Sequence, residues 1–213
     1  MSYDIRLKEN FKLFISGPSR CGKTFFVGDL ITNINTFSKE PPEEIVYIYS
    51  VWQWKYDEMR SIVNHFIKDD ENILKKIQEI SSGKRILVVF DDLMNSPSLS
   101  TVAHLYTVDG RHMNLSLIFL SQRLFKNDEA FRQISRNSDY YCIFKSVRDV
   151  CEIRTLAQQM TPGSLELVDI YQKATKNPWS YLFIDLTQEC DESLRYRYDL
   201  FKYDHYIPII QPF

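Results

Sequence analysis

Four stretches of the chain are almost continuously apolar, and they restrict the possible folds more than any other feature. They are RILVVF (85–90), LSLIFLS (115–121), YYCIFK (140–145) and YLFIDL (181–186). A strand with one face in water alternates apolar and polar residues, whereas a strand of a parallel sheet is covered on both faces and stays apolar throughout. The sequence therefore predicts an α/β fold with a mostly parallel central sheet that helices cover on both faces.

Weaker signals complete the expected order of elements. FKLFIS (11–16) and EIVYIYS (44–50) are typical of two more buried strands. Helical spacing of apolar residues predicts helices over residues 24–36, 55–67, 71–81, 148–160 and 164–175. The alternation of strands and helices again favours a parallel sheet.

The composition is that of one globular domain. The 213 residues are enough for a single sizeable core, and no linker-like stretch divides them. Hydrophobic residues make up 44% and charged residues 25%, which excludes disordered and collagen-like classes. We expect a single domain over residues 1–213, with a core over about 11–187 and a C-terminal extension over about 188–213.

Charge and cysteine content limit the expected partners and location. The net charge is −2, so a DNA contact would need a local basic patch or a pore formed by several subunits. The four cysteines contain no CxxC pair, and we expect all of them to be reduced. Because the N-terminus is polar and no apolar run approaches the length of a membrane span, we expect a soluble, intracellular protein without a membrane partner.

The segment GPSRCGKT (17–24) matches the pattern G-x-x-x-x-G-K-[ST] in full. Glycines in this pattern let backbone N–H groups turn toward a phosphate, the lysine contacts the β- and γ-phosphates, and the hydroxyl residue ligates Mg²⁺. A chance match in a loop is the alternative, but a strand is expected before the segment and a helix after it, as a nucleotide site requires. The residues expected to form that site are Gly17, Pro18, Ser19, Arg20, Cys21, Gly22, Lys23 and Thr24.

The segment RILVVFDDL (85–93) is an apolar strand that ends in two acids. Asp91 lies where an aspartate holds Mg²⁺ in P-loop enzymes, and Asp92 follows where a second carboxylate polarises the attacking water. The alternative is an acidic pair that begins a turn. The phosphate-binding pattern upstream favours the catalytic interpretation.

The next strand also ends in polar residues, Ser121 and Gln122. A side chain in this place can contact the γ-phosphate or orient water. Gln122 taken alone does not indicate this role, because glutamines at strand ends are commonly surface residues. The same holds for Arg111, which by itself is most simply a solvated loop charge.

Together, three segments resemble the FtsK–HerA superfamily of DNA-pumping ATPases, in particular its viral genome-packaging branch in poxviruses, other large DNA viruses, virophages and Polinton-like elements. The segments are GPSRCGKT (17–24), VVFDDLM (88–94) and GRHMNLSLIFLSQRLF (110–125), and the last is similar to the family pattern G-R-x-x-N-x-S-(V/L)-I-x-L-(S/T)-Q. The similarity extends over about residues 11–197. It implies a three-layer P-loop NTPase fold of the ASCE, RecA-like type.

The resemblance also implies roles for individual residues. Lys23 and Thr24 bind the phosphates and Mg²⁺, and Asp91 holds the Mg²⁺. Asp92 stands in the place of the catalytic acid, where many relatives have Glu. Gln122 matches the γ-phosphate sensor.

Arg111 matches a position proposed in relatives to act as an arginine finger across a subunit interface. The resemblance therefore implies a homo-oligomeric ring, with six subunits as in most relatives, that uses ATP and Mg²⁺. Double-stranded DNA, bound without sequence specificity, and capsid proteins are the implied partners. The implied location is the nucleus or a cytoplasmic viral factory of an infected cell, or the virion.

Three functions remain open from the sequence. The first is an ATP-hydrolysing motor that packages double-stranded viral DNA into a capsid. The second is a monomeric P-loop kinase or NTP-dependent transferase, which needs an acceptor pocket and an arginine-rich lid that residues 94–113 offer little of. The third is an assembly factor with little turnover, in which ATP only sets the quaternary state.

Several further residues need an interpretation of their own. Trp52 and Trp54 are expected to be buried against a helix, with stacking on adenine as the alternative. The alternating stretch RYRYDLFKYDHY (195–206) is expected to be an edge strand, with stacking on nucleic acid as the alternative. Cys21 precedes a helix N-terminus, where the pKa of a thiol falls, so we expect it to be alkylatable.

Overall fold

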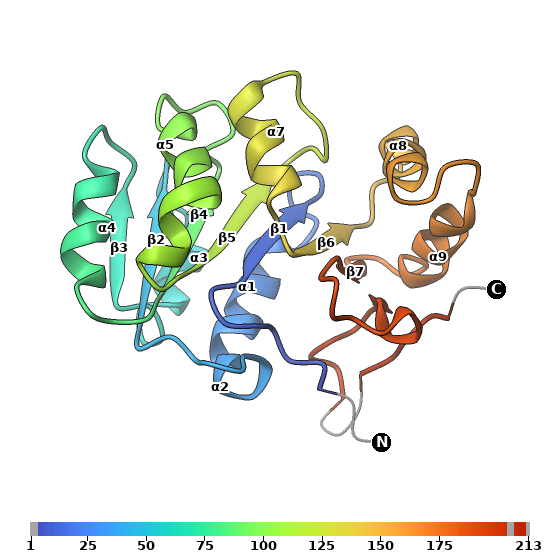
Figure 1. Cartoon of the computed structure of the whole chain (residues 1–213), viewed down its shortest axis with the longest axis horizontal. Coiled ribbons are helices and arrows are strands. Elements are labelled where there is room, and N and C mark those ends of the chain that lie inside the picture. The colour runs from blue at the N-terminus through green and yellow to red at the C-terminus, as the bar shows by residue number, and fades with distance from the viewer. Residues whose placement is uncertain (1–3, 204–206, 212–213) are drawn as a thin grey trace.

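One eight-stranded sheet forms the middle layer of the part of the chain that the computed structural model describes, residues 4–203 and 207–211 (Figure 1). The strands are β1 (Lys12–Ser16), β2 (Glu44–Tyr49), β3 (His65–Lys68), β4 (Ile86–Asp91), β5 (Leu115–Ser121), β6 (Tyr140–Phe144), β7 (Tyr181–Asp185) and β8 (Tyr196–Arg197). Their order in the sheet is β3-β2-β4-β5-β1-β6-β7-β8. Strands β1 to β6 pair in parallel, whereas β7 and β8 are antiparallel to their neighbours.

Helices cover both faces of this sheet (Figure 1). The helical segments are α1 (Lys23–Thr32), α2 (Ile34–Phe37), α3 (Lys55–Glu58), α4 (Ile73–Ser81), α5 (Leu99–His104), the π-helical turn η1 (Leu105–Asp109), α6 (Gly110–His112), α7 (Glu129–Arg136), α8 (Val150–Met160), α9 (Glu166–Ala174) and the 3-10 turn η2 (Glu192–Leu194). Successive strand residues point to opposite faces, so Phe14 joins the core under α4, α5 and α7 to α9, while Leu13 and Ile15 join the core under α1, α2 and α3. The predicted three-layer α/β fold is confirmed. None of the described helices is long and apolar enough to cross a bilayer.

The predicted helix over residues 55–67 is wrong beyond its first turn. Only Lys55–Glu58 is helical, and His65–Lys68 forms the edge strand β3 beside β2. The apolar residues of the segment are buried at helix-like intervals, which explains the misassignment. Asn64 starts the strand instead, because its side-chain oxygen accepts a hydrogen bond from the Ile45 N–H at 2.8 Å and its own N–H bonds the Ile45 carbonyl.

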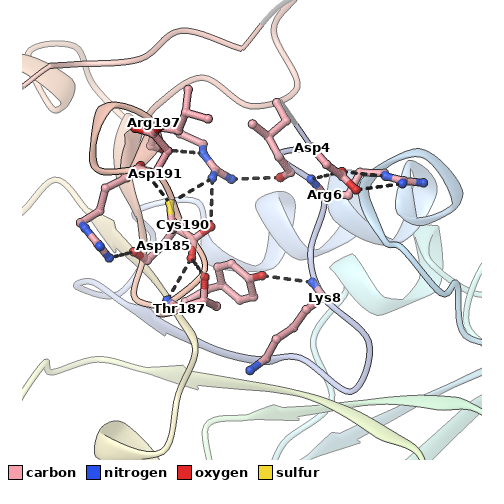
Figure 2. Close-up of polar contacts among 12 residues, drawn as sticks. Asp4, Arg6, Lys8, Asp185, Thr187, Cys190, Asp191 and Arg197 are labelled. Carbon is pink, nitrogen blue, oxygen red and sulfur yellow. Dashed lines mark hydrogen bonds and ion pairs between the residues drawn. The ribbon is translucent and has the colours of Figure 1, made fainter. Parts of the chain in front are cut away.

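Strand β8 is the last strand of the sheet, and polar contacts of its Arg197 join it to the segment that holds Asp4 and Arg6 (Figure 2). The Arg197 side chain is almost fully buried, and its Nη2 donates to Asp185 Oδ2 at 2.9 Å. Its Nη1 donates to the Ile5 carbonyl at 3.0 Å. In the described part of residues 195–206, Tyr196–Arg197 is therefore a short edge strand, and Arg197 is committed to an internal ion pair rather than to nucleic acid.

Candidate nucleotide-binding and catalytic site

The loop after β1 turns tightly around the N-terminus of α1. A Cβ on Gly17 would lie 2.6 Å from Cβ of Phe144, so no larger residue fits there. Gly22 has a φ of 107°, a left-handed conformation that glycine adopts at no steric cost. Because α1 begins at Lys23, the unpaired N–H groups of its first turn and the positive end of its dipole face this loop.

The Lys23 side chain folds back across this loop. Its Nζ donates to the carbonyl oxygens of Gly17 at 2.7 Å and Pro18 at 3.0 Å. Burial lowers the pKa of Lys23, and the neighbouring acidic groups partly offset this decrease. Hydrogen bonds between ionised groups are stronger than those to neutral carbonyls, so a phosphate competes effectively for this ammonium.

Asp91 ends β4 and is 5% exposed. Its Oδ2 accepts a hydrogen bond from the phenol of Tyr47 on β2 at 2.7 Å. It accepts a second one from the phenol of Tyr56 in α3 at 2.9 Å. Burial raises the pKa of Asp91, while the two phenols and Lys23 act in the opposite direction. The phenols thus hold the carboxylate in one orientation, and sequence patterns gave no sign of either contact.

The next residue, Asp92, has an uncommon backbone conformation that sets the direction of its carboxylate. Asp92 has a φ of 61°, a region in which Asp and Asn are the most tolerated non-glycine residues. Gln122 Nε2 donates to Asp92 Oδ1 at 3.2 Å. Since β5 lies between β1 and β4, Gln122 stands between the phosphate loop and the acid.

A cavity of about 610 Å³ brings these groups together, and we call it the phosphate cavity. It is lined by Ser19, Arg20, Gly22, Lys23, Thr24, Phe25, Gln53, Trp54, Lys55, Asp91, Asp92, Leu120, Ser121, Gln122 and Trp179. A hydroxyl and a carboxylate are the hard oxygen donors that Mg²⁺ prefers, so Thr24 and Asp91 fit the metal of a nucleotide complex. The catalytic and metal-binding roles of these residues stay predictions.

Three of the loop residues do not line the phosphate cavity. The carbonyl oxygens of Gly17 and Pro18 instead accept the hydrogen bonds of Lys23 Nζ. Cys21 is buried, and that burial raises the pKa of its thiol. The expectation of a reactive Cys21 is therefore wrong, because desolvation outweighs the effect of the helix N-terminus.

Arg111 precedes β5, at the end of the parallel strands that is opposite to the phosphate cavity. Its backbone is in α6, just before β5, and its side chain is outside what the structure describes. Gln122 follows the opposite end of the same strand, and the seven residues of β5 span about 20 Å at the usual rise. Arg111 is thus separated from the phosphate cavity of its own chain by the length of the strand.

All three tryptophans are partly or largely exposed to solvent. Trp54 is 67% exposed and Trp52 is 37% exposed, so the expected burial is wrong for both, although Trp52 packs edge-on against Tyr49 and Tyr56. Trp179, which no motif singled out, is 72% exposed and lines the same cavity. Its sequence position, between a helix and a buried strand, gives no signal of this placement.

We expect Tyr47→Phe and Tyr56→Phe to raise the Mg²⁺ concentration needed for half-maximal ATP hydrolysis several-fold. Each change removes one hydrogen bond to the Asp91 carboxylate, and such a bond to a charged group contributes about 1.5–3 kcal/mol. A Mg²⁺ titration at fixed ATP measures the effect. Tyr141→Phe is the matched control, because this phenol bonds Ser135 instead. An unchanged Mg²⁺ dependence in both variants would show that the phenols do not orient Asp91.

The sheet order and the site together define a class of protein. A phosphate loop after β1, an acid pair after β4 and a polar residue after the intervening β5 are the features of a P-loop ATPase. The chain matches the family model of the poxvirus A32 protein over residues 1–204, and it belongs to that family. The resemblance to the poxviral branch inferred from the sequence is confirmed. No curated protein sequence matches the chain.

Solved structures of similar fold include secretion ATPases. EssC (ATPases 2 and 3) from Geobacillus thermodenitrificans is 14% identical with a TM-score of 0.52, and the match covers 74% of this chain and 35% of that one. The cytoplasmic domain of the type VII secretion ATPase EccC from Thermomonospora curvata is 13% identical with a TM-score of 0.55, and the match covers 88% and 26%. The chain thus spans well under half of these proteins. At such low identity the likeness shows the P-loop ATPase fold alone.

Proposed function

We propose that this chain is an ATP-hydrolysing motor that moves double-stranded DNA into a viral capsid as a homo-oligomeric ring, with six subunits expected. Membership of the poxvirus A32 family supports this proposal. The observation that carries it is the separation of Arg111 from the phosphate cavity by the length of β5. Because Arg111 is that far from the site of its own chain, we infer that it serves the site of a neighbouring subunit and that the complete catalytic site exists only in the assembly.

The groups of one subunit prepare the reaction. Lys23 and the N–H groups of the loop bind the β- and γ-phosphates of ATP, and Thr24 with Asp91 holds Mg²⁺. Bound Mg²⁺ neutralises the charge that develops on the phosphates. Asp92 accepts the proton of the attacking water, and Gln122 fixes the Asp92 carboxylate and contacts the γ-phosphate.

The neighbouring subunit completes the site. An arginine finger contributes about 10³–10⁵ to the rate in P-loop NTPases. Hydrolysis therefore depends on ring assembly, and an isolated subunit is slow. DNA in the pore is held by phosphate contacts, which carry no sequence information, and a ring multiplies the few basic residues of each slightly acidic subunit.

The kinase alternative loses support from the segment between the acid pair and Arg111. A kinase needs a mobile lid there, but α5 and η1 are packed into the core, with Val102, Leu105 and Tyr106 fully buried. The motor function also implies that capsid proteins are partners of this chain. It implies a location in an infected cell or in the virion.

The test is ATP hydrolysis at increasing protein concentration, with and without long double-stranded DNA. We expect the specific activity to rise with concentration and to increase further with DNA. Arg111→Ala should bind ATP normally but hydrolyse it slowly, whereas Arg60→Ala, which removes an exposed ion pair with Asp57, should behave as wild type. Activity per subunit that is independent of both concentration and DNA would contradict the motor function.

A further inference from the structure

A second cavity, of about 580 Å³, adjoins the phosphate cavity, and we call it the aromatic cavity. The two share Gly22, Phe25 and Trp179 in their walls. Rings of Phe26, Phe144, Tyr181 and Phe201 form much of the rest, and Asp29 adds a carboxylate. A mostly apolar cavity with few polar groups, open to a phosphate-binding loop, has the properties of a nucleoside subsite.

The sheet order fixes the direction in which a nucleotide lies. Asp91, Asp92 and Gln122 are at the ends of β4 and β5, on one side of β1. The aromatic cavity is on the other side, where Phe144 ends β6 and Tyr181 starts the adjacent β7. A triphosphate with its γ-phosphate at the acids therefore has its nucleoside directed into the aromatic cavity.

Two exposed rings stand where the cavities meet. Trp179 has a φ of 57°, which is strained for a large side chain, and it still leaves most of its indole in solvent. Phe25, in the first turn of α1, is 53% exposed, and Lys55 Nζ lies 3.8 Å from its ring centroid. The exposed indole of Trp179 lines both cavities, so a flat partner at their junction can stack on it.

A carboxylate lies within reach of such a partner. Asp29 is one helical turn after Phe25, so both side chains project from the same face of α1 into the cavity. A second carboxylate of the cavity, Asp199, is already paired with Lys202 at 2.8 Å. Asp29 lies near the charge of Lys55, and of these two carboxylates it is the one that remains as an acceptor for an amino group on a base.

We propose that the aromatic cavity binds the adenine base of ATP, with Trp179 and Phe25 stacking on the ring and Asp29 accepting a hydrogen bond from its 6-amino group. This inference rests on the proposed nucleotide site. It also assigns Trp54 no contact with the base, because Trp54 follows β2, on the same side of β1 as the acids.

The experiment compares the affinity of the full chain for ATP and for inorganic tripolyphosphate, which lacks the nucleoside. Trp179→Ala should weaken ATP about tenfold or more and leave tripolyphosphate unchanged. Trp54→Ala, the matched control for an exposed indole, should not change the ratio of the two affinities. Asp29→Ala should remove the preference for ATP over purine riboside triphosphate, which lacks the 6-amino group.

Intrinsic fluorescence gives an independent readout. The chain has three tryptophans, and ATP should quench wild type and Trp52→Phe but not Trp179→Phe. Equal loss of ATP and tripolyphosphate in Trp179→Ala, or a selective loss of ATP in Trp54→Ala, would overturn the base assignment. Failure of wild type to bind either compound would overturn the nucleotide site as well. If Trp179→Ala loses affinity for ATP alone, and DNA does not change the rate of ATP hydrolysis by the wild-type chain, the base assignment stands and only the motor function is contradicted.

Discussion

Asp92→Asn is expected to lower the rate of ATP hydrolysis by about 10²–10⁴-fold, the usual contribution of a general base, while ATP affinity is retained. Asn is nearly isosteric with Asp and tolerates the left-handed backbone at φ 61°, so the loop keeps its shape. Its side-chain oxygen still accepts the hydrogen bond from Gln122. The amide, however, cannot take a proton from water. Turnover and ATP affinity, measured on the same preparation, check both parts.

Asp57→Asn is the control for this change. Asp57 is exposed and forms a surface ion pair with Arg60, so its loss should leave turnover and affinity unaltered. Turnover at the wild-type rate in Asp92→Asn would contradict the assignment of the base. Weak ATP binding by the variant would instead show that Asp92 acts mainly on the bound nucleotide.

Arg197→Met is expected to lower the free energy of unfolding by about 3–5 kcal/mol, because it leaves Asp185 as a buried charge without its partner. The change also removes the hydrogen bond that ties the sheet to Ile5 near the start of the chain (Figure 2). Denaturant unfolding measures the loss directly. The melting temperature should fall by about 2–4 °C for each kcal/mol in a chain of this size.

The double variant Arg197→Met with Asp185→Leu separates the two causes. It removes both charges, and replacing a buried ion pair with apolar residues is often neutral. We expect it to recover most of the stability that Arg197→Met loses. A single variant as stable as wild type would show that Asp185 finds another partner or is solvated.

The predictable part of the fold is the part that is apolar on both faces. Strands β1, β2 and β4 to β7 were expected because a run such as RILVVF can be buried only between two layers. The edge strand His65–Lys68 was not expected, since it is only partly buried and its pattern depends on the pairing with β2. The helical segments between β4 and β5 were missed because α5, the π-helical turn and α6 are each too short to show a period.

The candidate site divides in the same way. The phosphate loop is local in sequence, so its glycines and Lys23 are visible in a single motif. The contacts of Tyr47 and Tyr56 with Asp91 depend on strand order, which sequence patterns do not specify. Trp179 reaches the loop only because β7 folds back beside β6.

The central claim is that each catalytic site is shared between two subunits, and mixing two inactive variants tests it most directly. Asp92→Asn lacks the base but keeps Arg111, while Arg111→Ala lacks the arginine but keeps Asp92. In a head-to-tail ring of equal parts, about a quarter of the sites combine an intact base with an intact arginine from the neighbour, so about a quarter of wild-type activity should return. A mixture no more active than its two components would contradict a shared site.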